Sequence, residues 1–301
     1  MIKPLVKKKF LDHFYHEVKD HVLEDDRSRL NLHIIRILNN QFAIKPLMQE
    51  LLNHMISFCL SKKEYKNLIE EERFGELAEL AQERFRDYES NEGEFGELLL
   101  YCFLESHLEA PKLLTKMNLK TSHNDYVKGA DGVHLLKLSE NNYQIVFGES
   151  KMYKTFKEGL RKAFSSINSF INHKKNNIHF EINLVNTHFD QEIEDEQTYE
   201  EIKKIIFPSA QEDEINTDNA FGIFVGFNLE LDSQIKRLSN SDFQNTVRGM
   251  VKDVVKKEYK YIESQIDKYE LYGYTFYIYC IPFVDIEKVR KEAIKKLKGE
   301  G

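Results

Sequence analysis

The chain has 301 residues, of which 43 are Lys or Arg and 50 are Asp or Glu, so its formal net charge is −7. This balance excludes a uniformly basic coat for nucleic acid, although a net charge does not say where a local basic surface lies. Three well-separated cysteines, an N-terminus without an apolar signal core and a longest apolar run of seven residues predict a cytoplasmic protein with reduced thiols and no membrane span.

Residues 1–89 are expected to form a mainly helical N-terminal region that packs on the rest of the chain or on a partner. The apolar segment from Leu30 to Leu38 fits either a strand or a helix. Pro46 suits the first turn of a helix that runs to Cys59, and a second helical stretch spans Tyr65 to Tyr88. Residues 90–93 indicate a break before the next helix.

Residues 90–301 alternate between helical and strand-like patterns. Expected helices cover residues 94–108, 155–172 and 232–268 and a stretch after residue 285. Expected strands cover residues 132–138, 143–147, 178–185, 221–229 and 274–281. An acidic insertion over residues 190–214, with ten carboxylates, is expected to be exposed. This order of elements predicts a mixed α/β sheet flanked by helices.

The pattern Glu-x-Lys occurs five times, and four copies lie in segments expected to be helical or highly charged surface. Glu149 and Lys151 differ because they follow the apolar run from Tyr143 to Phe147. Alternation along a strand puts their side chains on one face. Charges at the end of a central strand need a chemical reason, so this pair is the first candidate for catalysis.

Asp131 stands at the start of the preceding strand. Folding the hairpin about residues 139–142 brings Asp131 back beside Glu149 and Lys151. Asp131 shares their face if the turn has an odd number of residues or if Gly148 sits in a bulge. The alternative is that Asp131 and Gly132 form a turn with no chemical role.

A third acidic element opens the helix that begins at Glu94. Glu97 precedes Leu100, Tyr101 and Leu104 at helical spacing, so it belongs to an apolar stripe. A carboxylate on such a stripe costs several kcal/mol unless it binds a cation or a proton donor. The alternative, a charge that complements the helix dipole, fits Glu94 better than Glu97.

These residue types point to metal-assisted hydrolysis. Two or three carboxylates at a strand end suit Mg²⁺ (or Mn²⁺), which prefers oxygen ligands. Such an ion polarises a phosphodiester and lowers the pKa of a bound water. We expect Asp131 and Glu149 to bind the metal and Glu97 to bind it or position water. Lys151 is expected to act on the water or the scissile phosphate.

The spacing of Asp131, Glu149 and Lys151 after a helix glutamate resembles the PD-(D/E)xK nuclease superfamily. The core order of that superfamily, with a helix before three strands, a helix and a strand, fits residues 94–185. The resemblance implies a restriction-endonuclease-like nuclease domain over residues 90–301, with Ser150 adding a carbonyl ligand to the metal. Ala130 departs from the proline of the motif name, which is weakly held in the superfamily.

Longer runs resemble a narrower family. E-F-G-E-L-L-L-Y, G-A-D-G-V-H, G-E-S-K, F-G-I-F-V-G-F and Y-I-Y-C-I-P-F-V-D-I are similar to HamA, the nuclease subunit family of the Hachiman anti-phage defence system. The resemblance covers about residues 90–290. It implies a DNA nuclease that a HamB-like helicase partner holds in check and that is released when the helicase acts on DNA.

A basic helix follows the Glu-x-Lys pair and supports DNA binding independently. Its candidate phosphate contacts are Lys154, Lys157, Arg161 and Lys162. Phe156 could stack on a base, but core packing suits it better. A second basic cluster, from Arg248 to Lys260, is better explained as a solvated helix face.

Other enzyme classes lack their motifs. The chain contains no GxxxxGK(S/T), GxGxxG or GxSxG pattern, which argues against an ATPase, a dinucleotide enzyme and a serine hydrolase. One alternative function remains open, an inert nuclease-fold adaptor or DNA-binding subunit that docks on a helicase through the acidic insertion and the N-terminal region. The presence of Asp131, Glu149 and Lys151 together favours the enzyme, because an adaptor has no need to keep these three residues.

Overall fold

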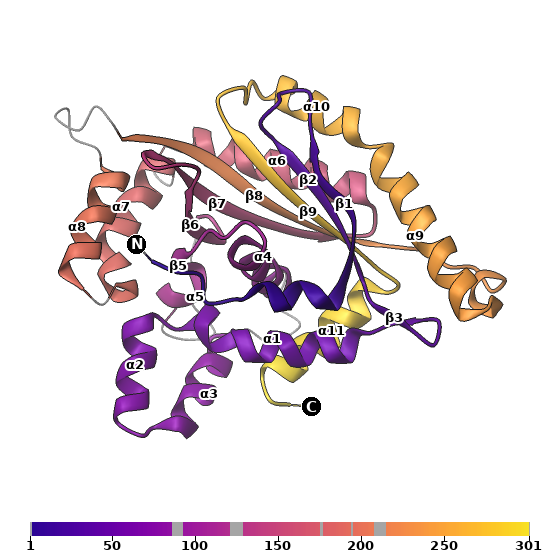
Figure 1. Ribbon diagram of the computed structural model, residues 1–301, viewed down its shortest axis with the longest axis horizontal. Helices are drawn as coiled ribbons and strands as arrows, with labels where there is room; N and C mark the ends of the chain where they lie inside the picture. The colour runs from indigo at the N-terminus through magenta and orange to yellow at the C-terminus, as the bar shows by residue number, and fades with distance from the viewer. Residues whose placement is uncertain are drawn as a thin grey trace.

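The computed structural model describes residues 2–85, 93–120, 129–174, 177–193, 195–207 and 215–300. Its centre is a seven-stranded sheet with the order β1-β2-β9-β8-β7-β6-β5 (Figure 1). The strands are β1 (Phe14–Val22), β2 (Arg29–Ile35), β5 (Lys112–Thr115), β6 (Gly132–Lys137), β7 (Asn142–Tyr153), β8 (Asn216–Asn228) and β9 (Thr275–Phe283). Two short strands, β3 (Ile37–Leu38) and β4 (Gln41–Phe42), pair separately.

The centre of the sheet is parallel and its two sides are antiparallel. The central strands β2, β9, β8 and β7 run parallel, and β1, β6 and β5 extend the two sides with antiparallel pairs. All nine residues of β9 are buried, as expected for a parallel strand that is covered on both faces. The mixed α/β sheet predicted from the sequence is confirmed.

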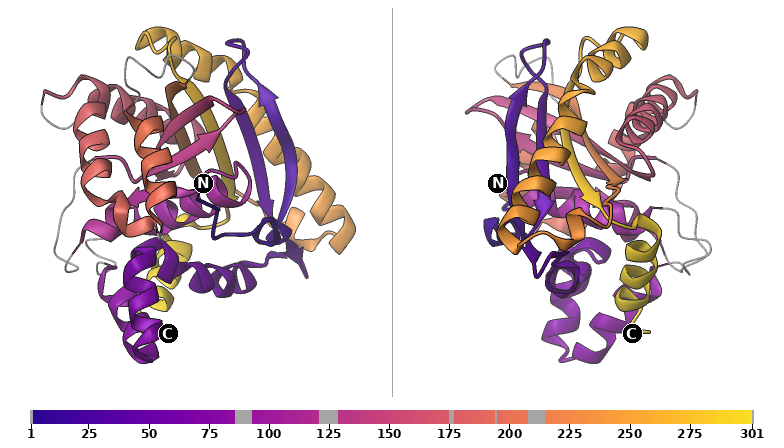
Figure 2. Two further views of the ribbon diagram at one scale, coloured as in Figure 1. Left: turned by 60° about the vertical axis from the view of Figure 1, so that its left-hand side comes forward. Right: turned by 90° about the vertical axis from the view of Figure 1, so that its right-hand side faces the viewer.

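Helices cover both faces of the sheet (Figure 2). One apolar cluster joins the sheet to α1 (Ile44–Cys59), α2 (Lys62–Glu70), α3 (Phe74–Glu83), α4 (Glu94–Ser106) and α11 (Ile286–Leu297). The other joins it to α6 (Phe156–Asn172), α7 (Ile178–His188), α8 (Glu196–Ile206), α9 (Asn240–Lys256) and α10 (Tyr259–Lys268). The short elements are η1 (Lys8–His13), α5 (Lys116–Leu119), η3 (Phe189–Glu192) and η4 (Ile235–Arg237). Among the described residues, no helix has the length and apolar character to cross a membrane.

The N-terminal region contributes strands as well as helices. The segment from Leu30 to Leu38, which fits either structure in sequence, forms β2 and β3. Strand β2 pairs with β9, so the first 35 residues complete the same sheet that carries the Glu-x-Lys pair. Helices α1, α2 and α3 follow, and the expected break at residues 90–93 falls mostly outside the described residues.

The strand expected at residues 178–185 is wrong, because this segment is helix α7. Its apolar residues at positions 178, 180, 182 and 184 alternate as in a strand, which explains the error. The buried positions are instead Ile178, Glu181 and Val185, at helical spacing, and Phe180 is left exposed. Asn177 starts the helix by accepting a hydrogen bond from the Phe180 backbone N–H.

The single helix expected over residues 232–268 is also wrong, because α9 and α10 are separate helices. Each packs on a different neighbour: α9 contacts β1 and β2, whereas α10 contacts α6. Ser239 caps α9 by accepting from the Asp242 backbone N–H, which sets its start eight residues later than expected from residue 232.

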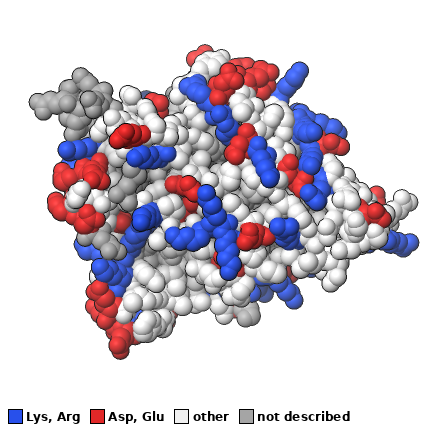
Figure 3. All heavy atoms as spheres, in the orientation of Figure 1, with Lys and Arg blue, Asp and Glu red and all other residues white. Residues whose placement is uncertain are grey.

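The acidic insertion is partly built into the core. Within residues 190–214, the structure describes 190–193 and 195–207, which contain α8. Ile202, Ile205 and Ile206 of α8 are buried, whereas its acidic residues face outward. Acidic side chains gather near α8 at one side of the view in Figure 3. Glu192 departs from the expectation because it is buried.

Candidate active site

The hairpin register brings the two predicted acids together. Lys137 pairs with Tyr143, and Val133 pairs with Phe147. Residues 138–142 lie between the pair nearest the turn, so the turn has the odd number of residues that a shared face requires, and the strand pairs end at Val133 and Phe147. The Asp131 backbone N–H donates to the Gly148 carbonyl at 2.9 Å, which extends the contact between the strands to this point.

Asp131 is fixed by its neighbours on β7. Its Oδ2 accepts a hydrogen bond from the Ser150 backbone N–H at 2.7 Å, and its side chain is only 8% exposed. Glu149 forms an ion pair with Lys151, with 2.5 Å between Oε1 and Nζ. The structure therefore gathers Asp131, Glu149 and Lys151 at the strand end that the sequence indicated.

The two glutamates in the first turn of α4, Glu94 and Glu97, have different surroundings. Glu94 is buried and accepts a hydrogen bond from the Lys120 ammonium, so it belongs to an internal ion pair. Glu97 instead lines a small cavity together with Asp131 and Gly148. Burial and the Asp131 charge raise the pKa of Glu97 to about 8. Of the two, Glu97 is the residue that reaches the candidate site.

Sequence reasoning missed Lys116, the first residue of α5. Its Nζ lies 2.6 Å from Asp131 Oδ1. Burial opposes the ammonium charge, but the charges of Asp131, Glu97 and Glu149 outweigh burial and raise the pKa of Lys116. No motif marks this lysine, because it comes from a basic, polar stretch in which neither β5 nor α5 was expected.

The donor set is compatible with a hard divalent ion. Mg²⁺ is commonly held by one or two carboxylates, with water completing its shell. Asp131, just before β6, and Glu149, on β7, supply two carboxylates. Burial and the Asp131 charge raise the pKa of Glu149, while Lys151 opposes this effect. The described residues contain no group of three or more His, Cys, Asp or Glu side chains arranged around a metal position, so Glu97 and the Ser150 carbonyl remain predicted ligands.

The contact between α4 and β7 explains the glycine of the E-F-G-E run. A Cβ atom at Gly96 would lie 2.3 Å from Ser150 Oγ and 3.3 Å from Met152 Cγ. Only glycine lets the two elements approach this closely. The helix turn that carries Glu97 is therefore held directly against the strand that carries Glu149.

We expect Gly96→Ala to lower the free energy of unfolding by about 1–3 kcal/mol, because overpacking forces α4 away from β7. Gly249→Ala is the matched control, since Gly249 also lies inside a helix but has no atom within 4 Å of its Cβ position. That change should stabilise the protein by about 0.5–1 kcal/mol. Urea unfolding measures both. Removing the Ser150 hydroxyl should restore part of the loss, and equal stabilisation by both glycine variants would contradict this packing.

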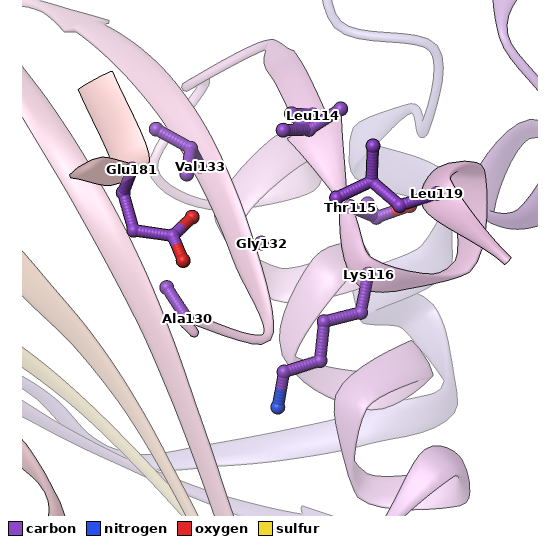
Figure 4. A pocket seen from close by; sticks show the side chains of 8 residues that line it. All are labelled: Leu114, Thr115, Lys116, Leu119, Ala130, Gly132, Val133 and Glu181. Atoms are coloured by element: carbon purple, nitrogen blue, oxygen red, sulfur yellow. The ribbon is translucent and has the colours of Figure 1, made fainter. Parts of the chain in front are cut away.

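Glu181 of α7 is a further acid near the site. It lies beside Ala130, in the turn before Asp131, on the opposite side of this turn from Lys116 (Figure 4). It accepts a hydrogen bond from the Ala130 backbone N–H. A Cβ atom at Gly129, whose φ is +131°, would lie 1.6 Å from Glu181 Oε1. The glycine of the G-A-D-G run is thus required by its backbone angle and by this carboxylate. Because residues 178–185 were expected to form a strand, Glu181 was not identified from the sequence as a buried residue near the site.

The pH dependence of stability should report on Glu181. Burial raises its pKa to about 7, above the value of about 4.3 in an unfolded chain. The unfolded state therefore loses this proton first, so the group reduces stability as pH rises from about 4.3 to 7. Between pH 5 and pH 8, wild type should lose about 2–3 kcal/mol relative to Glu181→Gln. Urea unfolding at both pH values measures this, and a parallel response of the two proteins would contradict it.

The predicted basic helix is α6, and it begins directly after β7. Lys154, Lys157 and Arg161 are exposed. Phe156 is buried in the core, which agrees with core packing and not with stacking on a base. Lys157 is less free than expected, because its Nζ lies 4.6 Å from the Tyr261 ring centroid and 3.8 Å from Glu258. Lys162 lies over the Tyr153 ring at 6.0 Å.

A comparison with known protein families finds a match over most of the chain. A family model described as HamA matches residues 8–297, which is nearly the whole chain. A search of curated proteins finds no match.

Proposed function

The chain belongs to the HamA family of the Hachiman anti-phage defence system, and from this premise we propose that it is a metal-dependent DNA nuclease regulated by a partner helicase. The observation that carries the proposal is the strand end where Asp131 and Glu149 lie with two lysines. Carboxylates and ammonium groups in one partly buried site suit the hydrolysis of a phosphodiester, which needs both a metal position and charge stabilisation.

Each group would have a separate role. Asp131 and Glu149 would hold Mg²⁺ or Mn²⁺, with Glu97 and the Ser150 carbonyl as further ligands. The ion would polarise the phosphodiester and lower the pKa of a bound water. Lys151, whose side chain is 26% exposed, can reach the attacking water or the scissile phosphate. Its positive charge would offset the negative charge that builds up in the transition state.

DNA would approach along the start of α6. Lys154 and Arg161 are exposed there, and backbone phosphates are the groups that such cations contact. The net charge of −7 supports weak binding to free DNA, and therefore delivery of the substrate by a helicase of the same defence system.

Reconstitution tests the proposal. The full chain would be purified alone and together with a helicase of the same defence system, then incubated with linear DNA, ATP and either Mg²⁺ or EDTA. We expect cleavage in Mg²⁺ that increases strongly with the helicase, and none in EDTA. Failure to cleave with the helicase in both Mg²⁺ and Mn²⁺ would overturn the nuclease and favour the inert adaptor.

A further inference from the structure

Lys116 is bound to the same carboxylate that the proposed metal would need. Its Nζ lies 2.6 Å from Asp131 Oδ1, while Asp131 Oδ2 already accepts the Ser150 backbone N–H. Both oxygens of Asp131 therefore have partners within the chain. A divalent ion that takes Oδ1 as a ligand must displace the ammonium or share the oxygen with it.

The backbone that carries Lys116 is firmly held. Thr115 pairs with Gly132 across β5 and β6, and Thr115 and Asn118 form a reciprocal cap around α5. Thr115 Oγ1 also donates to the Phe58 carbonyl at 2.8 Å. The side chain itself extends past the turn at Ala130, on the opposite side from Glu181 (Figure 4), and it is 21% exposed. A fixed backbone with a partly exposed side chain permits movement of the side chain alone.

Electrostatics distinguish Lys116 from Lys151. The charges of Asp131, Glu97 and Glu149 all act on Lys116. Lys151 is attracted by Glu149 and Asp131 and repelled by Lys116. Lys116 therefore interacts with all three carboxylates, and its direct ion pair is with Asp131. Without it, only Lys151 and, at Glu97, Lys120 would offset the charges of these acids, and the repulsion between the carboxylates would increase in a partly buried site.

We propose that Lys116 is an internal counter-cation that holds Asp131 in place and competes with the divalent ion for Asp131 Oδ1, so that it sets the metal concentration the site requires. This inference rests on the proposed function, because it takes Asp131 as a metal ligand. It adds a positioning residue that lies outside the D and E-x-K pattern. The ammonium weakens metal binding but keeps the carboxylates together before the metal arrives.

Calorimetric titration of the full chain with Mg²⁺ or Mn²⁺ alone tests this role without measuring cleavage. Lys116→Met should bind the ion about tenfold more tightly than wild type, because a neighbouring positive charge is removed. Lys137→Met is the control, since Lys137 is exposed on β6, and it should bind like wild type. Lys116→Gln, which keeps a donor for Asp131 but lacks the charge, should show the same tightening if Lys116→Met does not fold.

Thermal unfolding gives a second readout. In EDTA, Lys116→Met should melt below wild type, and added Mg²⁺ should raise its melting temperature by more than it raises that of wild type. Equal or weaker ion binding by both Lys116 variants would overturn the counter-cation while leaving the nuclease intact. Absence of binding by wild type and all variants would instead overturn the metal site of the proposed function, and the counter-cation with it.

Discussion

Glu149→Gln is expected to reduce DNA cleavage about 10³-fold or more, with little loss of stability. The amide has the shape of the carboxylate but lacks its charge, so it is a poor ligand for a divalent ion and releases Lys151 from its ion pair at 2.5 Å. Removing even one group that stabilises charge in a transition state costs about 10²–10³-fold in rate. Glu149 would contribute to both metal binding and lysine placement.

The fold should tolerate this change. Burial and the charge of Asp131 raise the pKa of Glu149, which means that the folded chain favours a neutral group there. Glu201→Gln is the matched control, because Glu201 begins another Glu-x-Lys pattern but lies exposed on α8. Steady-state cleavage with the helicase and urea unfolding should be measured for both. Similar cleavage rates for the two variants would remove Glu149 from the mechanism.

Lys112→Met is expected to lower the free energy of unfolding by about 3–5 kcal/mol, which is the cost of removing one partner of a buried ion pair. Lys112 and Glu192 are each 2% exposed, and their charged atoms lie 3.0 Å apart. The same ammonium donates to the carbonyls of Ser57 at 2.7 Å and Leu60 at 2.9 Å. Its loss leaves Glu192 and the end of α1 without these bonds.

A double variant separates the pair from the packing. Lys112→Met with Glu192→Leu removes both charges, and such exchanges are often neutral relative to the intact pair, so it should recover much of the loss. Lys8→Met is the surface control, because Lys8 and Glu109 are 74% and 59% exposed; an exposed pair is worth about 0–1 kcal/mol. Urea unfolding measures all three variants. Equal losses of unfolding free energy in Lys112→Met and Lys8→Met would contradict a stabilising role for the buried pair.

The site was predictable where short-range rules determine it. Strand alternation alone puts Glu149 and Lys151 on one face, and hairpin parity brings Asp131 to them. The structure meets both conditions through the register of β6 and β7. The apolar stripe beside Glu97 likewise favoured Glu97 over Glu94 as a site residue, and Glu94 is paired with Lys120 in the structure. In each case the relevant neighbours lie within one helix or one hairpin.

Contacts between distant segments were not predictable in this way. Lys116 reaches Asp131 only because β5 pairs with β6, and a single sequence carries no signal for that pairing. Glu181 was missed because its segment alternates like a strand, while burial follows the helical positions around it. Strand β1 was not expected because its residues are mostly half-buried or exposed, which weakens the apolar pattern on which a strand prediction depends.

The catalytic role of Asp131, Glu149 and Lys151 is tested most directly by cleavage of an end-labelled DNA duplex. Wild type and Lys151→Met would each be assayed with the helicase, in either Mg²⁺ or EDTA. We predict that only wild type in Mg²⁺ produces breaks, because both the divalent ion and the Lys151 charge are needed at the scissile phosphate. Equal cleavage by the two proteins, or cleavage by wild type that persists in EDTA, would contradict it.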